Sequence, residues 1–233
     1  MNLFYQPQLA QGILHLDADE SRHVVKVLRK KQGDPITLTD GKGFFYEGTI
    51  TDPDPRQCAF AISKKIHESS KNFTIHIAIS PTKNADRIEW FVEKAVEFGI
   101  DEITLLECDH TERQHINIDR LEKVAISAMK QSLKAKLPSI NSLTSFRNLT
   151  HDAKALEKYI AHVDSENPIQ LKNLVARGSS YLVLIGPEGD FSREELTLAK
   201  SLGFKKISLG PSRLRTETAG LAACHILNLA NTP

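Results

Sequence analysis

A run of apolar residues at 181–186, YLVLIG, constrains the fold more than any other stretch of the chain. A strand without polar alternation is typical of a parallel sheet that is covered on both faces. Around this run, segments with strand periodicity at 73–80, 102–107 and 205–210 alternate with segments of helical periodicity. The helical segments are 86–99, 120–136, 192–203 and 217–230. The alternation predicts an α/β domain with a mostly parallel sheet.

Individual residues indicate where the predicted helices begin and which positions face the core. Ser192 with Glu195, and Asp119 with Glu122, have the spacing of a capping box at a helix start. Trp90 and the phenylalanines beside it are predicted to lie in the core. The last helix has few polar positions, which predicts burial of Ala219, Leu221, Ala222, Ala223, Ile226, Leu227 and Leu229.

The first 70 residues follow a different pattern, with short strands and one helix. Strands are predicted at 13–17, 35–40, 43–50 and 57–66, and the sequence DGKG at 40–43 favours a tight hairpin turn. A helix is predicted at 19–30, with an apolar side formed by Val24, Val25, Val27 and Leu28. Short strands joined by hairpins favour a small β-barrel. The sequence therefore predicts one domain at 1–70 and a second at 71–233.

The charges nearly balance, with 30 Lys and Arg against 29 Asp and Glu and a net charge of +1. A nucleic acid would therefore be bound through a local patch rather than through the overall charge. One such patch is formed by Arg22, Lys26, Arg29 and Lys30, of which the first three recur at helical spacing. Such a run is also typical of an ordinary solvated helix face.

The spacing of the cysteines and the length of the apolar runs indicate the cellular compartment of the protein. Cys58, Cys108 and Cys224 are far apart and lack a CxxC spacing, which predicts neither a disulfide framework nor a zinc site. No apolar run approaches the roughly 20 residues that span a bilayer, and the first ten residues lack the features of a signal peptide. We therefore expect a cytoplasmic protein without metal or membrane.

Two glycine-containing loops follow predicted strands, GPEGDF at 186–191 and GPSRLRTET at 210–218. Ligands in open α/β sheets bind beyond the carboxyl ends of the strands, where both loops are placed. Neither loop has a phosphate-binding glycine pattern, which argues against ATP, GTP and NAD in their commonest binding modes and leaves a nucleoside without phosphates open as a ligand. The alternative is that both are structural turns and that Glu217 only stabilises a helix start.

These loops also carry a family resemblance. LIGPEGDFSREEL, followed by LGPSRLRTETAGLAA, strongly resembles the C-terminal signature loops of the RsmE family, the 16S rRNA uracil-N3 methyltransferases of the SPOUT superfamily. The segment at 80–113 resembles the first block of that family, and HVVKVLRKKQGDPITLTDGKG resembles its PUA-like RNA-binding barrel.

The resemblance implies a trefoil-knotted α/β domain that binds S-adenosylmethionine and acts as a homodimer on the small ribosomal subunit. It implies a cofactor site at Leu184, Gly186, Pro187, Glu188, Gly189, Leu209, Gly210, Leu214, Arg215, Thr216, Thr218 and Ala219. Uracil N3 must lose a proton before it attacks a methyl group, so the site must supply a base, or stabilise the uracil anion with positive charge or hydrogen-bond donors near its carbonyl oxygens. Glu217 is the candidate base and Arg215 the candidate cation. Lys83 and Arg87 are candidates for contacting RNA or the cofactor carboxylate.

The chain departs from the family pattern at three positions. Asp190 follows Gly189 where a second glycine is expected, and Lys130 and Lys134 stand where an acidic residue and an arginine are expected. Two other functions remain open at this point. One is ribose 2′-O-methylation of rRNA or tRNA, and the other is a non-catalytic RNA-binding role in ribosome assembly.

Overall fold

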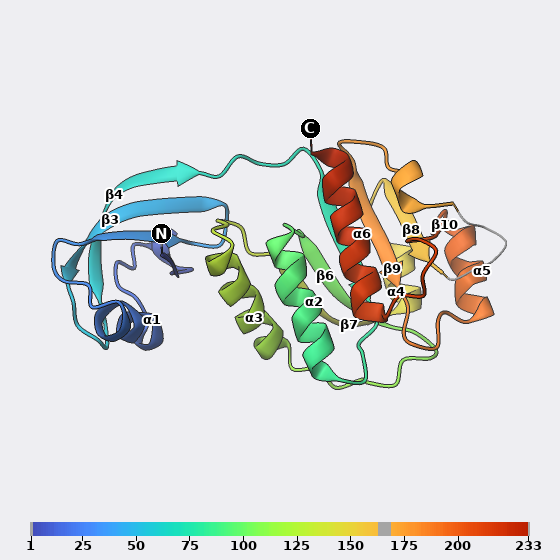
Figure 1. Cartoon of the computed structure of the whole chain (residues 1–233), viewed down its shortest axis with the longest axis horizontal. Helices are drawn as coiled ribbons and strands as arrows, with labels where there is room; N and C mark the ends of the chain where they lie inside the picture. Colours follow the sequence, from blue (N-terminus) through green and yellow to red (C-terminus); the bar gives the residue numbers. More distant parts are fainter. Residues whose placement is uncertain (1, 163–168, 233) are drawn as a thin grey trace. The chain divides into compact units, whose positions relative to one another are not determined.

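Two sheets organise the computed structural model, which describes residues 2–162 and 169–232 (Figure 1). One has four strands in the order β1-β2-β3-β4, and the other has six in the order β10-β8-β9-β5-β6-β7. The chain divides into two compact units. The N-terminal unit comprises Met1–Ser70 and Ile126–Leu137, and the C-terminal unit comprises Lys71–Ala125 and Pro138–Pro233.

The sheet of the N-terminal unit is built from the predicted hairpin strands and one short strand at the start of the chain. In this sheet β1 runs parallel to β2, and the other pairs are antiparallel. The strands are β1 (Leu3–Tyr5), β2 (Pro35–Thr39), β3 (Phe44–Asp52) and β4 (Ala59–His67), with a 3₁₀ turn η1 (Leu9–Gln11) after the first. The strand predicted at 13–17 is wrong, because this segment forms only a single bridge, between His15 and Ala59.

The helix predicted at 19–30 is shorter and changes its winding. Helix α1 (Ala18–Arg22) begins where the Asp17 carboxylate accepts the Glu20 N–H at 2.8 Å, and a π-helical turn η2 (His23–Val27) follows. The wider turn rotates later side chains away from the expected face. Val24 is buried, whereas Val27 is 64% exposed and does not lie on the predicted apolar side. The helix ends before Arg29, whose φ is +55°.

Residues 126–137 complete the N-terminal unit from a distant part of the sequence. The Gly43 N–H donates to the Ala135 carbonyl at 2.9 Å, and the Leu137 N–H donates to the Gly41 carbonyl at 2.9 Å. The amino group of Lys130 pairs with the carboxylate of Glu20 within the same unit. Lys130, which stands where the family pattern has an acidic residue, therefore forms an ion pair in this structure.

Helix α3 (Ile118–Gln131) differs from its prediction at both ends. The Asn117 side chain accepts the Arg120 N–H at 3.0 Å, so Asn117, and not Asp119 with Glu122, caps the start. The helix was predicted to reach residue 136 but ends at Gln131, and Leu133 has a φ of +54°. A left-handed residue cannot continue a right-handed helix.

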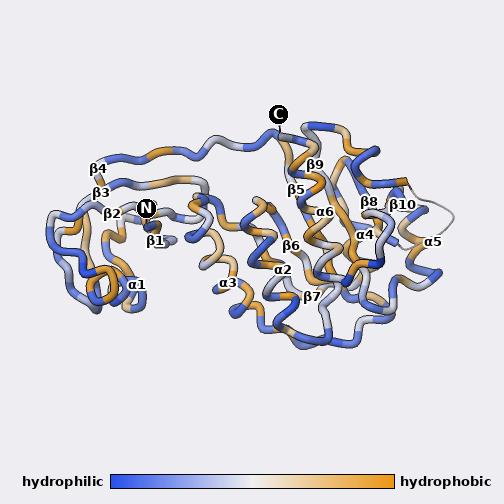
Figure 2. The backbone as a smooth tube through the Cα atoms, in the orientation of Figure 1, coloured by the Kyte–Doolittle hydropathy of each residue, from blue (hydrophilic) through white to orange (hydrophobic). Residues whose placement is uncertain are grey.

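The sheet of the C-terminal unit is parallel throughout, as the alternation of strands and helices predicts. Its central strands are strongly apolar, as Figure 2 shows for β5 and β9. The strands are β5 (Thr74–Ile79), β6 (Glu102–Glu107), β7 (Ser139–Ser145), β8 (Glu157–Ala161), β9 (Ser180–Ile185) and β10 (Lys205–Ile207). Because the strands are parallel, their carboxyl ends meet at one edge of the sheet.

Helices cover both faces of this sheet (Figure 1). Helices α2 (Ala85–Glu97) and α6 (Thr216–Asn231) pack together on one face, where Gly220 lies against Phe91 and Ile79. On the other face, α4 (Phe146–Asp152) and α5 (Arg193–Ser201) contribute to a cluster with Leu182 and Leu184. A 3₁₀ turn η3 (Leu171–Asn173) precedes β9. The capping box predicted at the start of α5 is confirmed.

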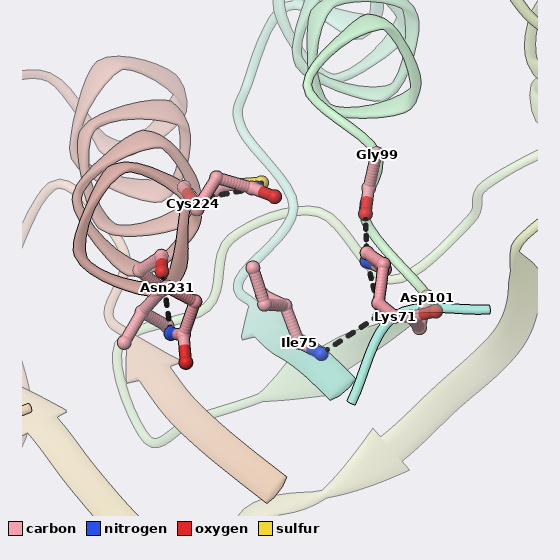
Figure 3. A network of polar contacts seen from close by, with 8 residues as sticks. Lys71, Ile75, Gly99, Asp101, Cys224 and Asn231 are labelled. Carbon is pink, nitrogen blue, oxygen red and sulfur yellow. Dashed lines mark hydrogen bonds and ion pairs between the residues drawn. The ribbon is translucent and has the colours of Figure 1, made fainter. Parts of the chain in front are cut away.

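Polar contacts stabilise the amino-terminal edge of the parallel sheet, opposite the loops at 186–191 and 210–218 (Figure 3). The Lys71 amino group donates to the Gly99 carbonyl at 2.5 Å and to the Asp101 carboxylate at 2.8 Å, and this carboxylate also accepts the Ile75 N–H at 3.0 Å. At the end of α6, the Asn231 side chain accepts the Gly178 N–H at 2.7 Å. Anchoring this end of α6 at the amino-terminal edge leaves its first turn at the carboxyl-terminal edge.

The burial predicted for the last helix holds only in part. Ala223 and Leu227 are buried, together with Gly220 and Cys224. Leu229 is 66% exposed, so its predicted burial is wrong in this chain. One side of α6 therefore faces away from the sheet.

Candidate active site

The loop after β9 and the loop after β10 meet at the carboxyl edge of the sheet. The Thr216 hydroxyl, in the first turn of α6, donates to the Gly186 carbonyl at 3.1 Å. Leu184 is fully buried beneath them, in the last part of β9. The two segments that the sequence singles out are therefore joined directly, through a buried threonine.

The glycines of the first loop have neighbours within the protein. A Cβ on Gly186 would lie 3.1 Å from the Phe191 ring, and one on Gly189 would lie 3.2 Å from His110 Cβ. The His110 Nδ1 lies 2.9 Å from the Asp190 carbonyl oxygen. Hydrogen bonding to that carbonyl raises the pKa of His110. The Phe191 and His110 side chains therefore leave little space for a Cβ at either glycine.

The departure at Asp190 has a conformational explanation. Asp190 has a φ of +62°, a left-handed conformation that glycine adopts freely and that aspartate tolerates better than most residues. Its carboxylate accepts the Phe191 N–H at 2.8 Å and lies 2.8 Å from the Nδ1 of His162. These contacts stabilise a turn that glycine forms without a side chain.

The loop after β10 is open at its glycine. Gly210 has a φ of +129°, and nothing lies within 4 Å of where its Cβ would be. The Gly210 N–H donates to the Ser208 hydroxyl at 3.3 Å. Arg215 then caps α6 through its backbone only, and its carbonyl accepts the Ala219 N–H at 2.8 Å.

A cavity of about 540 Å³ lies against this second loop. Its volume falls within the range of small-molecule sites, about 300–1,000 Å³. Eight residues from α2, the loop and the start of α6 line it, namely Asp86, Arg87, Trp90, Arg213, Leu214, Arg215, Glu217 and Thr218. Four of the predicted site residues, Leu214, Arg215, Glu217 and Thr218, meet here. The other predicted cofactor residues lie in the two loops, in β9 and in the first turn of α6 without lining this cavity.

Trp90 was predicted to lie in the core, and this prediction is wrong. It is 41% exposed, whereas the adjacent Phe91 is fully buried. Its position three residues after Arg87 places both side chains on one face of α2, and both line the cavity. That spacing was the signal in the sequence, because Arg87 was already a candidate for contacting a ligand.

Glu217 is the most unusual group in the cavity. Its side chain is 8% exposed, and Oε1 lies 3.9 Å from Arg87 Nε. The other oxygen, Oε2, is buried and has no hydrogen-bond partner within residues 2–162 and 169–232. A buried acceptor without a donor lowers stability, so a group of this kind is typically completed by a ligand or water.

Lys83 lies elsewhere at the same edge. Its amino group pairs with the Glu112 carboxylate at 2.8 Å, and this ion pair raises the pKa of Lys83. The backbone N–H of Lys83 also donates to the Glu188 carboxylate at 3.5 Å. Of Lys83 and Arg87, the two candidates for contacting RNA or the cofactor carboxylate, only Arg87 lines the cavity.

Cysteine and metal chemistry find no support in the described part of the chain. Cys58, Cys108 and Cys224 are buried, and burial raises the pKa of all three thiols, that of Cys224 to about 12. Thiols of this kind are poor nucleophiles at neutral pH. Within residues 2–162 and 169–232, no three side chains of His, Cys, Asp or Glu lie close enough together to hold a metal ion. No helix in those ranges is long and apolar enough to cross a membrane.

The four residues of the predicted basic patch, Arg22, Lys26, Arg29 and Lys30, all lie in the N-terminal unit. Arg22 pairs at 3.3 Å with Asp19, and both side chains are exposed. Lys26 and Arg29 are exposed, and the Lys30 amino group donates to the Pro35 carbonyl at 2.6 Å. The single helical face predicted for Arg22, Lys26 and Arg29 is wrong, because Arg29 follows the helix in a left-handed conformation.

Family models match both units of the chain. The model described as an RNA methyltransferase domain matches residues 69–228, and the model described as an RNA methyltransferase PUA domain matches residues 16–63. The chain belongs to this family of RNA methyltransferases. The resemblance of the two signature loops is thereby confirmed.

Named relatives agree over nearly the whole chain. A ribosomal RNA small subunit methyltransferase E from Buchnera aphidicola is 31% identical, with 95% of this chain and 90% of the relative covered. A structure from Porphyromonas gingivalis, described as a probable rRNA methyltransferase, is 42% identical in sequence and has a TM-score of 0.93. The match covers 98% of this chain and 99% of that structure. The structure of a ribosomal RNA small subunit methyltransferase E from Neisseria gonorrhoeae, bound to S-adenosylmethionine, is 25% identical in sequence and has a TM-score of 0.82. The match covers 99% of this chain and 98% of that structure.

Proposed function

We propose that the protein methylates N3 of a specific uridine in the 16S rRNA of the small ribosomal subunit, with S-adenosylmethionine as the methyl donor. The observation that carries the proposal is the buried, half-unpartnered Glu217 carboxylate in a cavity lined by three arginines. A carboxylate oxygen without a donor is suited to accept a proton from a ring nitrogen, and arginines are suited to bind the anion that results.

The residues at the sheet edge suit the cofactor. Open space beside Gly210 leaves its backbone accessible, and Leu214 provides an apolar wall in the cavity. The hydrogen bond between Thr216 and Gly186 keeps the two loops together. The Neisseria relative bound to S-adenosylmethionine supports the same assignment. We assign cofactor binding to Leu184, Gly186, Pro187, Glu188, Gly189, Leu209, Gly210, Leu214, Arg215, Thr216, Thr218 and Ala219.

S-adenosylmethionine supplies an electrophilic methyl carbon. The residues of the chain must supply a nucleophile at N3, which carries a proton in neutral uracil. Glu217 accepts this proton at Oε2, and Arg87 holds the carboxylate through Oε1. The Arg215 guanidinium binds the ring carbonyl oxygens, where the negative charge of the deprotonated ring is concentrated. With N3 deprotonated and held in place, the bound cofactor would supply the methyl group to N3, and the bond from the methyl carbon to sulfur would break to leave the neutral thioether of the demethylated product.

The N-terminal unit serves RNA binding in this proposal. Arg22, Lys26, Arg29 and Lys30 contact phosphates, which position an RNA without reading its sequence. The protein acts in the cytoplasm as a homodimer with a trefoil-knotted C-terminal unit, and the exposed side of α6 at Leu229 is consistent with a covered face. Light scattering of the purified protein tests the dimer.

Binding is tested first by calorimetric titration with S-adenosylmethionine, with its demethylated product, and with ATP as control. Saturable binding of the first two, and none of ATP, supports the cofactor site. Small subunits that lack the modification are then incubated with enzyme and labelled cofactor, and the nucleosides are analysed by mass. A methyl group on uracil supports the proposal, whereas a methyl group on ribose contradicts it.

The base is tested with the Glu217→Gln variant, which keeps the shape of the side chain and removes its basicity. General-base catalysis contributes about 100-fold to 10,000-fold, so kcat is expected to fall by that factor while cofactor affinity stays within threefold. The control is Glu194→Gln, which neutralises an exposed carboxylate in the first turn of α5. If Glu217→Gln keeps most of its activity, Glu217 only braces the loop.

A further inference from the structure

Trp90 is the chain's single tryptophan, and it stands exposed in the cavity rather than in the core. The neighbouring positions of α2 explain its direction, since Phe91 and Val92 are fully buried against the sheet. The side chain at position 90 therefore projects from the opposite side of the helix. An aromatic ring left accessible in a cavity is a typical binding element for a flat apolar ligand.

The other side chains of the cavity indicate which flat ligand fits. Arg87, Arg213 and Arg215 bring positive charge to the same cavity, and the Glu217 carboxylate offers an acceptor. A nucleobase in RNA has an aromatic face, polar edges with N–H donors, and phosphates on either side. The cavity presents a counterpart to each of these three features.

An aromatic platform also addresses an energetic need of the reaction. A base must leave its stack to reach a methyl donor, and it thereby loses the contacts of its neighbours. Stacking on a protein side chain replaces part of that loss. Tryptophan has the largest ring surface for this purpose, and Trp90 lines the same cavity as Glu217.

We propose that Trp90 is the stacking platform for the RNA base that enters the cavity, beside the carboxylate that deprotonates it. This inference rests on the proposed function and adds the residue that positions its substrate. Trp90 acts by orienting the ring, and Arg213 binds the adjoining phosphate.

The first test compares Trp90→Ala with Trp90→Phe, which keeps an aromatic ring. Stacking on an aromatic side chain contributes enough to change binding by about tenfold to a hundredfold. Trp90→Ala is therefore expected to lower kcat/KM for small subunits by that factor, without weakening S-adenosylmethionine binding. Trp90→Phe is expected to recover activity to within a few-fold of the wild type.

The matched control is Phe98→Ala, which removes the other exposed aromatic residue of this helix region. Phe98 is 39% exposed, packs against the His225 ring with centroids 4.6 Å apart, and does not line the cavity. Its removal is expected to leave kcat/KM within twofold of the wild type. A loss equal to that of Trp90→Ala would overturn the inference, because exposure on α2 would then matter more than the cavity.

The second test uses the fluorescence of Trp90 itself. Because no other tryptophan contributes, its emission reports this one position. Protein saturated with the demethylated cofactor is titrated with a protein-free transcript of small-subunit rRNA, and quenching is expected as RNA binds. The Phe98→Ala variant is expected to show the same quenching. Unchanged emission at saturating RNA would overturn the inference.

Other occupants of the Trp90 face give different results. If the adenine of the cofactor stacks there, Trp90→Ala weakens S-adenosylmethionine binding as much as it lowers kcat/KM. If a second copy of the chain covers the ring, Trp90→Ala lowers the mass measured by light scattering. Either result overturns the inference. Wild-type protein that binds cofactor but methylates no subunits refutes the proposed function and this inference together, whereas full activity of Trp90→Ala refutes the inference alone.

Discussion

Replacing Gly220 by alanine tests how tightly α6 is packed above the cavity, because helix propensity and packing predict opposite signs. Alanine in a helix interior is about 1 kcal/mol more favourable than glycine. A Cβ at position 220 would lie 2.7 Å from Phe91 Cε2 and 2.9 Å from Ile79 Cδ1. Both distances are shorter than real Cβ contacts, so the helix or its neighbours must move.

The expected change in the free energy of unfolding follows from these two effects. Overpacking a core by one methyl group costs about 1–3 kcal/mol, against a propensity gain of about 1 kcal/mol. Gly220→Ala is therefore expected to be neutral to about 2 kcal/mol less stable. With a shift of about 2–4 °C per kcal/mol for a chain of this size, the melting temperature falls by as much as about 8 °C. Thermal melting followed by circular dichroism measures the shift.

A double-mutant cycle identifies the cause. Phe91→Leu shortens the side chain that the new methyl group would strike, so Gly220→Ala should cost less in that background. Because Thr218 and Ala219, which we assign to cofactor binding, directly precede Gly220 in α6, the single variant should also lower the affinity for S-adenosylmethionine. The reasoning is refuted if Gly220→Ala stabilises the protein by about 1 kcal/mol, or if the two substitutions have additive effects.

Two further predictions concern charged groups away from the cavity. Lys130→Met leaves the Glu20 carboxylate, which is only 14% exposed, without its cation and is expected to cost about 3 kcal/mol of unfolding free energy. Urea unfolding measures this loss, and adding Glu20→Gln should recover part of it; no recovery would contradict the ion pair. Burial lowers the pKa of His76, although Glu102 acts in the opposite direction, so its neutral form stabilises the fold above pH 6.5 and that contribution is lost as the pH falls. Unfolding free energies between pH 7.5 and 5.5 should therefore fall less steeply in His76→Gln, and equal slopes would refute this.

The parallel sheet was predictable because its signal is local and repeated. Apolar runs such as 181–186 are required by a strand buried on both faces, whatever the details of the fold. The two loops were placed at a common edge by the same argument, since parallel strands end together. The role of these loops came from resemblance, because a glycine-proline turn has no single function.

The sequence misled where neighbours distant along the chain decide the outcome. Trp90 was assigned to the core because it is aromatic, but whether its ring is buried depends on whether a distant part of the chain covers its face of α2. The π-helical turn at His23–Val27 rotates the following residues by an amount that no 3.6-residue pattern contains. Glu217 was identified as a candidate, but the absence of a partner for its Oε2 depends on the whole surrounding cavity.

The membership of residues 126–137 in the N-terminal unit has a consequence for synthesis. Gly41 and Gly43 form backbone hydrogen bonds with Leu137 and Ala135, which the ribosome adds more than 90 residues later. During translation the hairpin turn at 40–43 emerges with these backbone groups bonded only to water. The first part of the chain to leave the ribosome therefore cannot reach its final form by itself, and its completion waits until residues 71–125 of the C-terminal unit have also been made.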